Sequence, residues 1–126
     1  MLRKARIFLF GAINSMARKN ALTSAPPFEV DQALKRLGAN LRTARLRRNL
    51  TLETAAGKIG TGVRAIRDAE AGRPGASAAV YTALLWAYDL LRPLAEIADP
   101  AQDKDGLAQE RQRKHAYPKK ALDNDF

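Results

Sequence analysis

The side chains available for chemistry in this 126-residue chain are mostly basic, because the residues that enzymes and metal sites use are scarce. The chain has no Cys and a single His, His115, which lies in a polar stretch. A thiolate nucleophile, a disulfide and a His-Cys metal cluster are therefore excluded, and no patterned carboxylates accompany the histidine. We expect no enzyme activity, no metal site and no cofactor.

The basic side chains themselves indicate the kind of partner. The chain has 22 Lys and Arg against 13 Asp and Glu, a net charge of +9, and residues 1 to 73 hold 15 of the basic and 5 of the acidic side chains. A one-sided positive charge of this size indicates a polyanionic partner, either nucleic acid or an anionic membrane surface. No apolar run reaches the roughly 18 to 20 residues that span a bilayer, which excludes an integral membrane protein.

One predicted helix, residues 63 to 71, has an apolar side and an opposite side with side chains of the kinds that can bind DNA bases. At about 100° per residue, Ala65, Ile66 and Ala69 share one side of this helix. The opposite side carries the candidate base-reading residues, namely Val63, Arg64, Arg67 and Asp68. A guanidinium can bind guanine O6 and N7 together, and a valine can touch a thymine methyl. The Asp68 carboxylate can only accept hydrogen bonds, either from a cytosine N4 or from a neighbouring Arg. For each of these four side chains, the alternative interpretation is an ordinary solvated surface residue.

Two further helices must position this face. Apolar residues at spacings of three and four predict a first helix that ends at Asn49, and Thr51 is a hydroxyl N-cap for a short second one. A turn at residues 60 to 62 joins the second helix to the third, which ends before Gly72. A helix, a three-residue turn with Gly and a helix make up the helix-turn-helix unit, whose second helix lies in the major groove of DNA.

The same patterns divide the chain into an arm, a domain and a tail. We expect residues 1–30 to be a flexible arm, because two consecutive prolines interrupt residues 17–30, and residues 31–98 to be the helix-turn-helix domain. Its fourth helix is capped by Ser77, and a short fifth segment follows. Residues 99–126 are predicted to be a polar, disordered tail. Residues 1–15 are interpreted as an extension upstream of a start at Met16, with a signal or a membrane anchor as the alternative.

The run LGANLRTARLRRNLTLETAAGKIGTGVRAIRDAEAGRPGAS resembles, without a gap, the lambda-repressor-like domain of the Xre family of bacterial and phage regulators. The resemblance rests on the Leu-Thr-Leu-Glu entry at residues 50–53, on Gly60, and on Glu70 followed closely by Gly72. It implies an all-α, five-helix lambda-repressor-like helix-turn-helix domain and a sequence-specific transcriptional repressor of the bacterial cytoplasm. The family usually has larger residues at Ala55 and Ala69, so we expect two tyrosines of the fourth helix, Tyr81 and Tyr88, to fill the core.

The resemblance also implies roles for individual residues. Arg64 lies where the family reads bases, while Arg45 and Glu70 correspond to a buried or half-buried ion pair that orients the recognition helix. Contacts to the DNA backbone are expected from Thr51, Lys58, Arg73, Ser77 and Arg42. For the cluster of Arg42, Arg47 and Arg48, an ordinary charged helix surface is an equally good interpretation.

Trp86 lies off the apolar stripe of the fourth helix, where the family usually has a polar residue. An exposed Trp is typical of an interface. With Leu91, Leu94 and Ile97 after it, we interpret this edge as a homodimer contact, with additional core packing as the alternative. Two-fold symmetry would require a pseudo-palindromic double-stranded DNA operator.

The overall layout resembles, more weakly, the antitoxins of the HipB type, whose partner is a HipA-like Ser/Thr kinase toxin. It has a basic arm, a small domain and a polar tail with an aromatic end, and the tail residues expected to bind the partner are Tyr117, Leu122 and Phe126. A type II antitoxin of this kind binds its toxin and represses its own operon. The alternatives are a solubilising tail and a stand-alone Xre-family regulator without a toxin.

Overall fold

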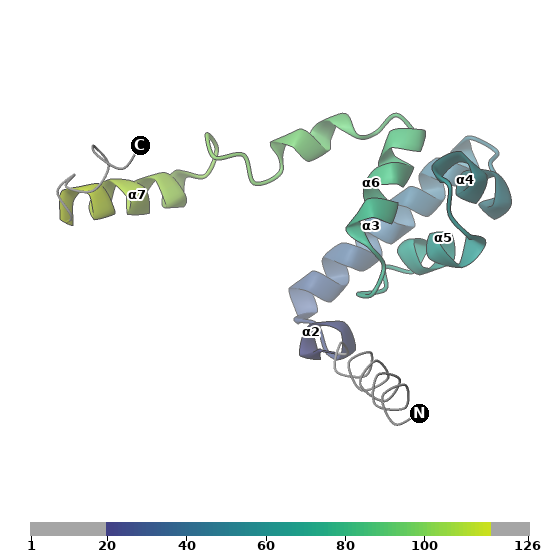
Figure 1. Ribbon diagram of the computed structural model, residues 1–126, viewed down its shortest axis with the longest axis horizontal. Helices are drawn as coiled ribbons and strands as arrows, with labels where there is room; N and C mark the ends of the chain where they lie inside the picture. Colours follow the sequence, from purple (N-terminus) through teal and green to yellow (C-terminus); the bar gives the residue numbers. More distant parts are fainter. Residues whose placement is uncertain (1–19, 117–126) are drawn as a thin grey trace, which may run out of the picture. The chain divides into compact units, whose positions relative to one another are not determined.

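The computed structural model describes residues 20–116 of the chain, and this part is helical throughout, without a strand. The prediction of an all-α fold is thereby confirmed. The chain divides after Leu90 into two compact units, which are described separately. In chain order (Figure 1) the elements are α2 (Ala21–Ser24), α3 (Phe28–Arg47), α4 (Leu52–Ile59), α5 (Val63–Glu70), α6 (Ala78–Ala87), the 3-10 helix η1 (Arg92–Glu96) and α7 (Lys104–Ala116).

The first long helix starts earlier than the sequence interpretation placed it. α3 begins at Phe28, with Pro27 as its N-cap residue, and α2 precedes it, capped by the Asn20 side chain, which accepts a hydrogen bond from the Thr23 N–H at 3.0 Å. Prolines are compatible with a helix start, because the first turn has no intrahelical use for its N–H groups. The flexible arm predicted for residues 1–30 is therefore wrong for residues 21–24 and 28–30, where the prolines separate two helices.

Two of the helix starts are where the sequence predicts them. The Thr51 hydroxyl accepts a hydrogen bond from the Thr54 N–H at 3.1 Å and caps α4, while the Ser77 hydroxyl accepts from the Val80 N–H at 3.2 Å and caps α6. Such caps satisfy N–H groups that the first helical turn leaves free. The Thr51 and Ser77 caps are confirmed.

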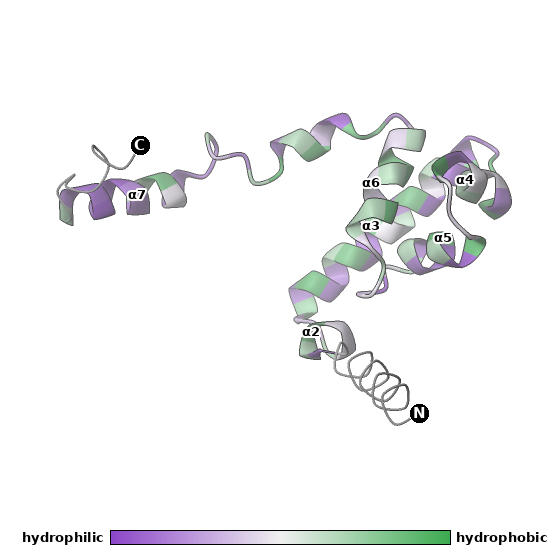
Figure 2. Ribbon diagram, viewed as in Figure 1, coloured by the Kyte–Doolittle hydropathy of each residue, from purple (hydrophilic) through white to green (hydrophobic). Residues whose placement is uncertain are grey.

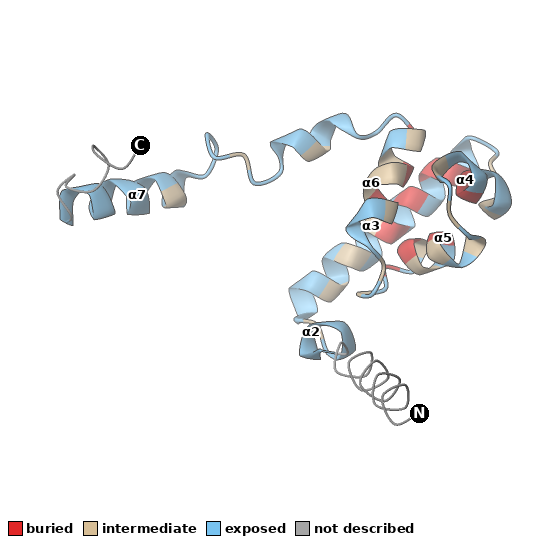
Figure 3. Ribbon diagram, in the orientation of Figure 1, coloured by how far each residue is buried: buried red, intermediate tan, exposed pale blue. Residues whose placement is uncertain are grey.

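The core of the first unit lies among α3, α4, α5 and α6, where the buried residues of Figure 3 face one another. Leu41, Ile66, Leu84 and Tyr88 are its largest fully buried side chains. Ala55 and Ala69 are also fully buried, which lets α4 and α5 approach closely. Tyr81 and Tyr88 are buried in the same cluster. The prediction that these two tyrosines fill the core beside the small residues Ala55 and Ala69 is therefore confirmed.

The second unit holds η1 and α7. The short fifth segment is a 3-10 helix, and it lies in this unit and not in the unit that contains the core. The prediction of disorder is wrong for residues 104–116, which form α7. The sequence of this helix, KDGLAQERQRKHA, is rich in helix-forming residues. The Asp103 carboxylate accepts a hydrogen bond from the Gly106 N–H at 2.9 Å, and Lys114 forms an ion pair with Glu110 at 3.4 Å. None of its residues is buried, and most are hydrophilic (Figures 2 and 3).

Between residues 20 and 116, no helix is long and apolar enough to cross a membrane. In the same range, His, Asp and Glu side chains form no cluster of three or more that would hold a metal ion.

Candidate DNA interface

The turn between α4 and α5 is short and fixed by its backbone. Gly60 ends α4 in the left-handed region, with φ of 75°, and the Thr61 N–H donates to the Ala56 carbonyl at 3.0 Å. A left-handed residue at this position favours Gly, because other side chains clash with the backbone there. α5 starts after Gly62, three residues beyond α4, so α4 and α5 form a helix-turn-helix pair.

One side of α5 is buried and the other faces solvent. Ile66 and Ala69 are fully buried against the neighbouring helices. Arg64 and Arg67 are exposed, and the other two predicted reading residues, Val63 and Asp68, are half-buried. The structure thus brings the four predicted reading residues to one short helix, with both arginines available to a ligand in solution.

Arg45 of α3 and Glu70 at the end of α5 form a bidentate ion pair. Arg45 Nε donates to Glu70 Oε2 at 2.7 Å and Nη2 donates to Oε1 at 3.0 Å, while Nη1 donates to the Leu50 carbonyl at 2.9 Å. The two side chains are only 9% and 8% exposed. The hydrogen bonds to the glutamate raise the pKa of Arg45 further, against the opposing effect of burial. Through Arg45, the pair connects the last residue of α5 to α3 and to the α3–α4 loop.

Two glycines allow α3 to approach the end of α5. A Cβ on Gly38 would lie 2.5 Å from the Ala69 carbonyl oxygen and 2.6 Å from that of Glu70. A Cβ on Gly72 would lie 2.5 Å from the Lys35 Cα, and its φ of 67° is itself left-handed. The sequence interpretation recognised Gly72 and missed Gly38. The signal that could have identified Gly38 is a glycine inside a helix, which costs about 1 kcal/mol relative to Ala unless packing requires it.

Arg48 has a structural role that sequence reasoning also missed. Its Nη1 donates to the Ala44 carbonyl at 2.9 Å, its Nη2 donates to the Tyr88 carbonyl at 2.8 Å, and its guanidinium lies 5.6 Å from the Tyr88 ring centroid. Arg48 therefore satisfies a carbonyl at the C-terminal end of α6. All three arginines of the cluster are exposed, and Arg48 is the one that makes these contacts within the domain.

The predicted backbone-contacting residues are spread over four elements of the first unit. Arg42 lies on α3, Thr51 and Lys58 at the two ends of α4, Arg73 in the α5–α6 loop and Ser77 at the start of α6. All five are exposed. Arg73 is also within 3.4 Å of Asp68, through its Nε and the Asp68 Oδ1.

The residues predicted to form a dimer contact are divided between the two units. Trp86 belongs to α6 in the first unit and its side chain is 64% exposed, as expected for a residue off the apolar stripe. Leu91, Leu94 and Ile97 belong to the second unit. The tail residues Tyr117, Leu122 and Phe126 lie outside the described residues.

Comparison with known families places a domain on the same segment. Residues 36–97 match a family model described as a helix-turn-helix domain. Neither a curated protein nor a solved structure matches the chain. The matched segment contains most of α3 together with α4, the turn, α5, α6 and η1. The match therefore agrees with the helix-turn-helix geometry of α4 and α5.

Proposed function

We propose that the protein is a sequence-specific DNA-binding transcriptional repressor that reads its operator with α5. The observation that carries this proposal is the geometry of α5: its C-terminal end is tied to α3 by the Arg45–Glu70 pair, and its outward side presents Arg64 and Arg67. A rigid helix with exposed arginines matches the major groove, where a guanidinium can bind guanine bidentately. Such a repressor would act in the bacterial cytoplasm.

This function can be tested by selecting bound duplexes from a random library. The affinity of the protein is then measured for the selected site and for a scrambled duplex. Arg64→Ala should weaken binding to the selected site by about 5- to 150-fold, the equivalent of 1 to 3 kcal/mol, and relax the preference at one base pair per half-site. Arg36→Ala, an exposed arginine of α3, is the charge-matched control and should leave the preference unchanged. Failure of the selection to enrich any site, or an equal loss on both duplexes, would contradict base reading by Arg64.

We further propose that the repressor acts as a homodimer on a pseudo-palindromic operator. The support is Trp86, a large apolar side chain that is mostly exposed in the single chain. Aromatic side chains of this kind commonly anchor interfaces. Sedimentation equilibrium should show a dimer that Trp86→Ser weakens. A wild-type chain that remains a monomer at micromolar concentration would rule the dimer out.

The second candidate role is that of an antitoxin with a HipA-like kinase partner, which would make the repressor autoregulatory. The observation that favours it is α7, a helix with no buried residue and with Arg111, Arg113 and Lys114 near its end. Such a helix has a free surface for an acidic partner. Deleting residues 121–126, and with them Leu122 and Phe126, should leave DNA binding intact and weaken capture of a co-expressed kinase at least tenfold. Unchanged copurification and silencing would leave the stand-alone regulator as the function.

A further inference from the structure

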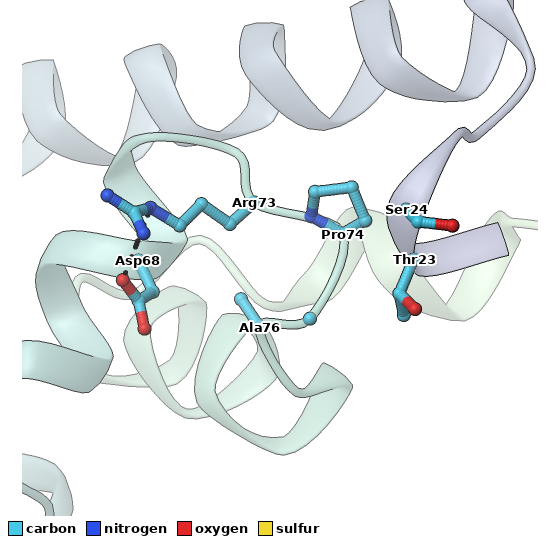
Figure 4. Close-up of a pocket in the computed structure, with 7 residues that line it drawn as sticks. Thr23, Ser24, Asp68, Arg73, Pro74 and Ala76 are labelled. Carbon is cyan, nitrogen blue, oxygen red and sulfur yellow. Dashed lines mark ion pairs between the residues drawn. The ribbon is translucent and has the colours of Figure 1, made fainter. Parts of the chain in front are cut away.

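An ion pair links the recognition helix to the loop that follows it. The Arg73 Nε lies 3.4 Å from Asp68 Oδ1, and Figure 4 shows the Arg73 side chain reaching from the loop to the carboxylate. The backbone enforces this approach, because the Arg73 N–H donates to the Asp68 carbonyl at 3.0 Å and Gly72 turns the chain in the left-handed region. Loop geometry therefore holds a predicted phosphate-binding arginine beside an acid of the recognition helix.

The pair is too exposed to contribute much to the stability of the fold. The Arg73 side chain is 67% exposed and the Asp68 side chain 32%. Exposed ion pairs at this distance contribute little to stability, and solvent screens them further. Its main effect is local, because Asp68 is the single acid among the outward-facing residues of α5, beside Arg64 and Arg67.

Among the described residues around the pair, Arg73 is the cation that a phosphate would meet there. A cavity of about 470 Å³ adjoins the pair and is also lined by Thr23, Ser24 and Ala76 (Figure 4). The Thr23 and Ser24 hydroxyls donate to the Asn20 carbonyl, at 3.0 and 3.1 Å, and neither side chain carries a positive charge. An anion entering this side would therefore depend on the Arg73 guanidinium, which Asp68 already engages.

We propose that Asp68 is a specificity-determining residue that competes with DNA phosphates for Arg73 and so weakens binding to non-cognate duplex. This inference rests on the proposed function. On any duplex, a phosphate that binds the Arg73 guanidinium competes for it with the Asp68 carboxylate. On the operator, the released carboxylate can accept from a cytosine N4, whereas on other sequences it is left beside phosphates without a donor.

The test is a salt titration of binding to a random-sequence duplex of about 20 base pairs, followed by fluorescence anisotropy. Asp68→Asn keeps the size of the side chain and removes its charge. We expect it to tighten random-duplex binding roughly three- to tenfold at low salt and to steepen the slope of log K against log salt by about one. Asp31→Asn is the matched control, because Asp31 forms a similar exposed pair with Lys35 at 2.9 Å on α3 and should leave the slope unchanged.

A double-mutant cycle separates competition for Arg73 from simple repulsion. In an Arg73→Gln background, Asp68→Asn should change random-duplex binding less than twofold, because the cation it would release is gone. An equal gain in both backgrounds, or no gain from Asp68→Asn alone, would overturn the proposal while leaving DNA binding by the wild type established. A wild-type chain that binds no duplex at low salt would instead overturn the proposed function and this inference with it. Unchanged thermal melting of each variant verifies that the fold is intact.

Discussion

Removing the Glu70 carboxylate should destabilise the helix-turn-helix domain strongly. In Glu70→Ala, the Arg45 guanidinium loses two hydrogen bonds, of 2.7 and 3.0 Å, and keeps its bond to the Leu50 carbonyl. Breaking one side of a buried pair costs about 3 to 5 kcal/mol, because the remaining charge stays buried without its partner. Both side chains retain slight exposure, 9% and 8%, so we expect a value near 3 kcal/mol. That is a large part of the roughly 5 to 15 kcal/mol that stabilises a small domain.

Urea denaturation followed by circular dichroism measures this change as a difference in the free energy of unfolding. Glu53→Ala is the control, since Glu53 is exposed in the first turn of α4 and should cost at most about 1 kcal/mol. Replacing both partners, Arg45→Met with Glu70→Leu, should cost less than either single change, because no unpaired charge remains. An unfolding free energy unchanged in Glu70→Ala would show that water reaches the pair and that the argument from burial is wrong.

Three further predictions concern packing, a buried hydroxyl and the titration of buried tyrosines. Gly38→Ala should lower the free energy of unfolding by about 1 to 3 kcal/mol, because the new methyl group would meet the Ala69 carbonyl. Gly57→Ala, in open space on α4, is the control and should raise this free energy by up to about 1 kcal/mol. Equal effects of the two substitutions in urea denaturation would contradict the close approach of α3 and α5. Tyr81→Phe should not destabilise, because the buried hydroxyl of Tyr81 has no hydrogen-bond partner in the described part of the chain. Burial raises the pKa of Tyr81 and Tyr88, so stability should fall as pH rises above about 10, and replacing both by Phe should reduce that fall in pH-dependent urea titrations.

Local signals in the sequence predicted the elements that hold the interface. Thr51 and Ser77 could be recognised as caps because an N-cap acts on N–H groups only two or three residues away. The burial of Ile66 and Ala69 followed from helical periodicity alone. Helical periodicity also identifies the outward side of α5, so the candidate base-reading residues could be predicted from the sequence.

The features that were missed depend on long-range contacts or on misleading composition. Arg48 binds the carbonyl of Tyr88, forty residues later, and nothing in the local sequence distinguishes it from the exposed Arg47. Gly38 is required by a contact with the end of α5, which periodicity does not reveal. α7 was missed because a polar composition typical of disorder is also rich in helix-forming residues.

The contacts of α3 with α5, the proposed recognition helix, give this helix an anchored C-terminal end and a proposed reading end. Gly38 and Arg45 of α3 both act on Glu70, the last residue of α5. Arg64, in the first turn, has no hydrogen bond or ion pair within the described residues and lies one turn or more from these anchors. Because exposed substitutions away from anchoring contacts change stability by about 0.5 kcal/mol or less, the reading end can vary in sequence while the fold is retained. Under the proposed function, stability and base preference depend on different residues of the same eight-residue helix, so the stability of Glu70 variants and the binding of Arg64 variants should change independently.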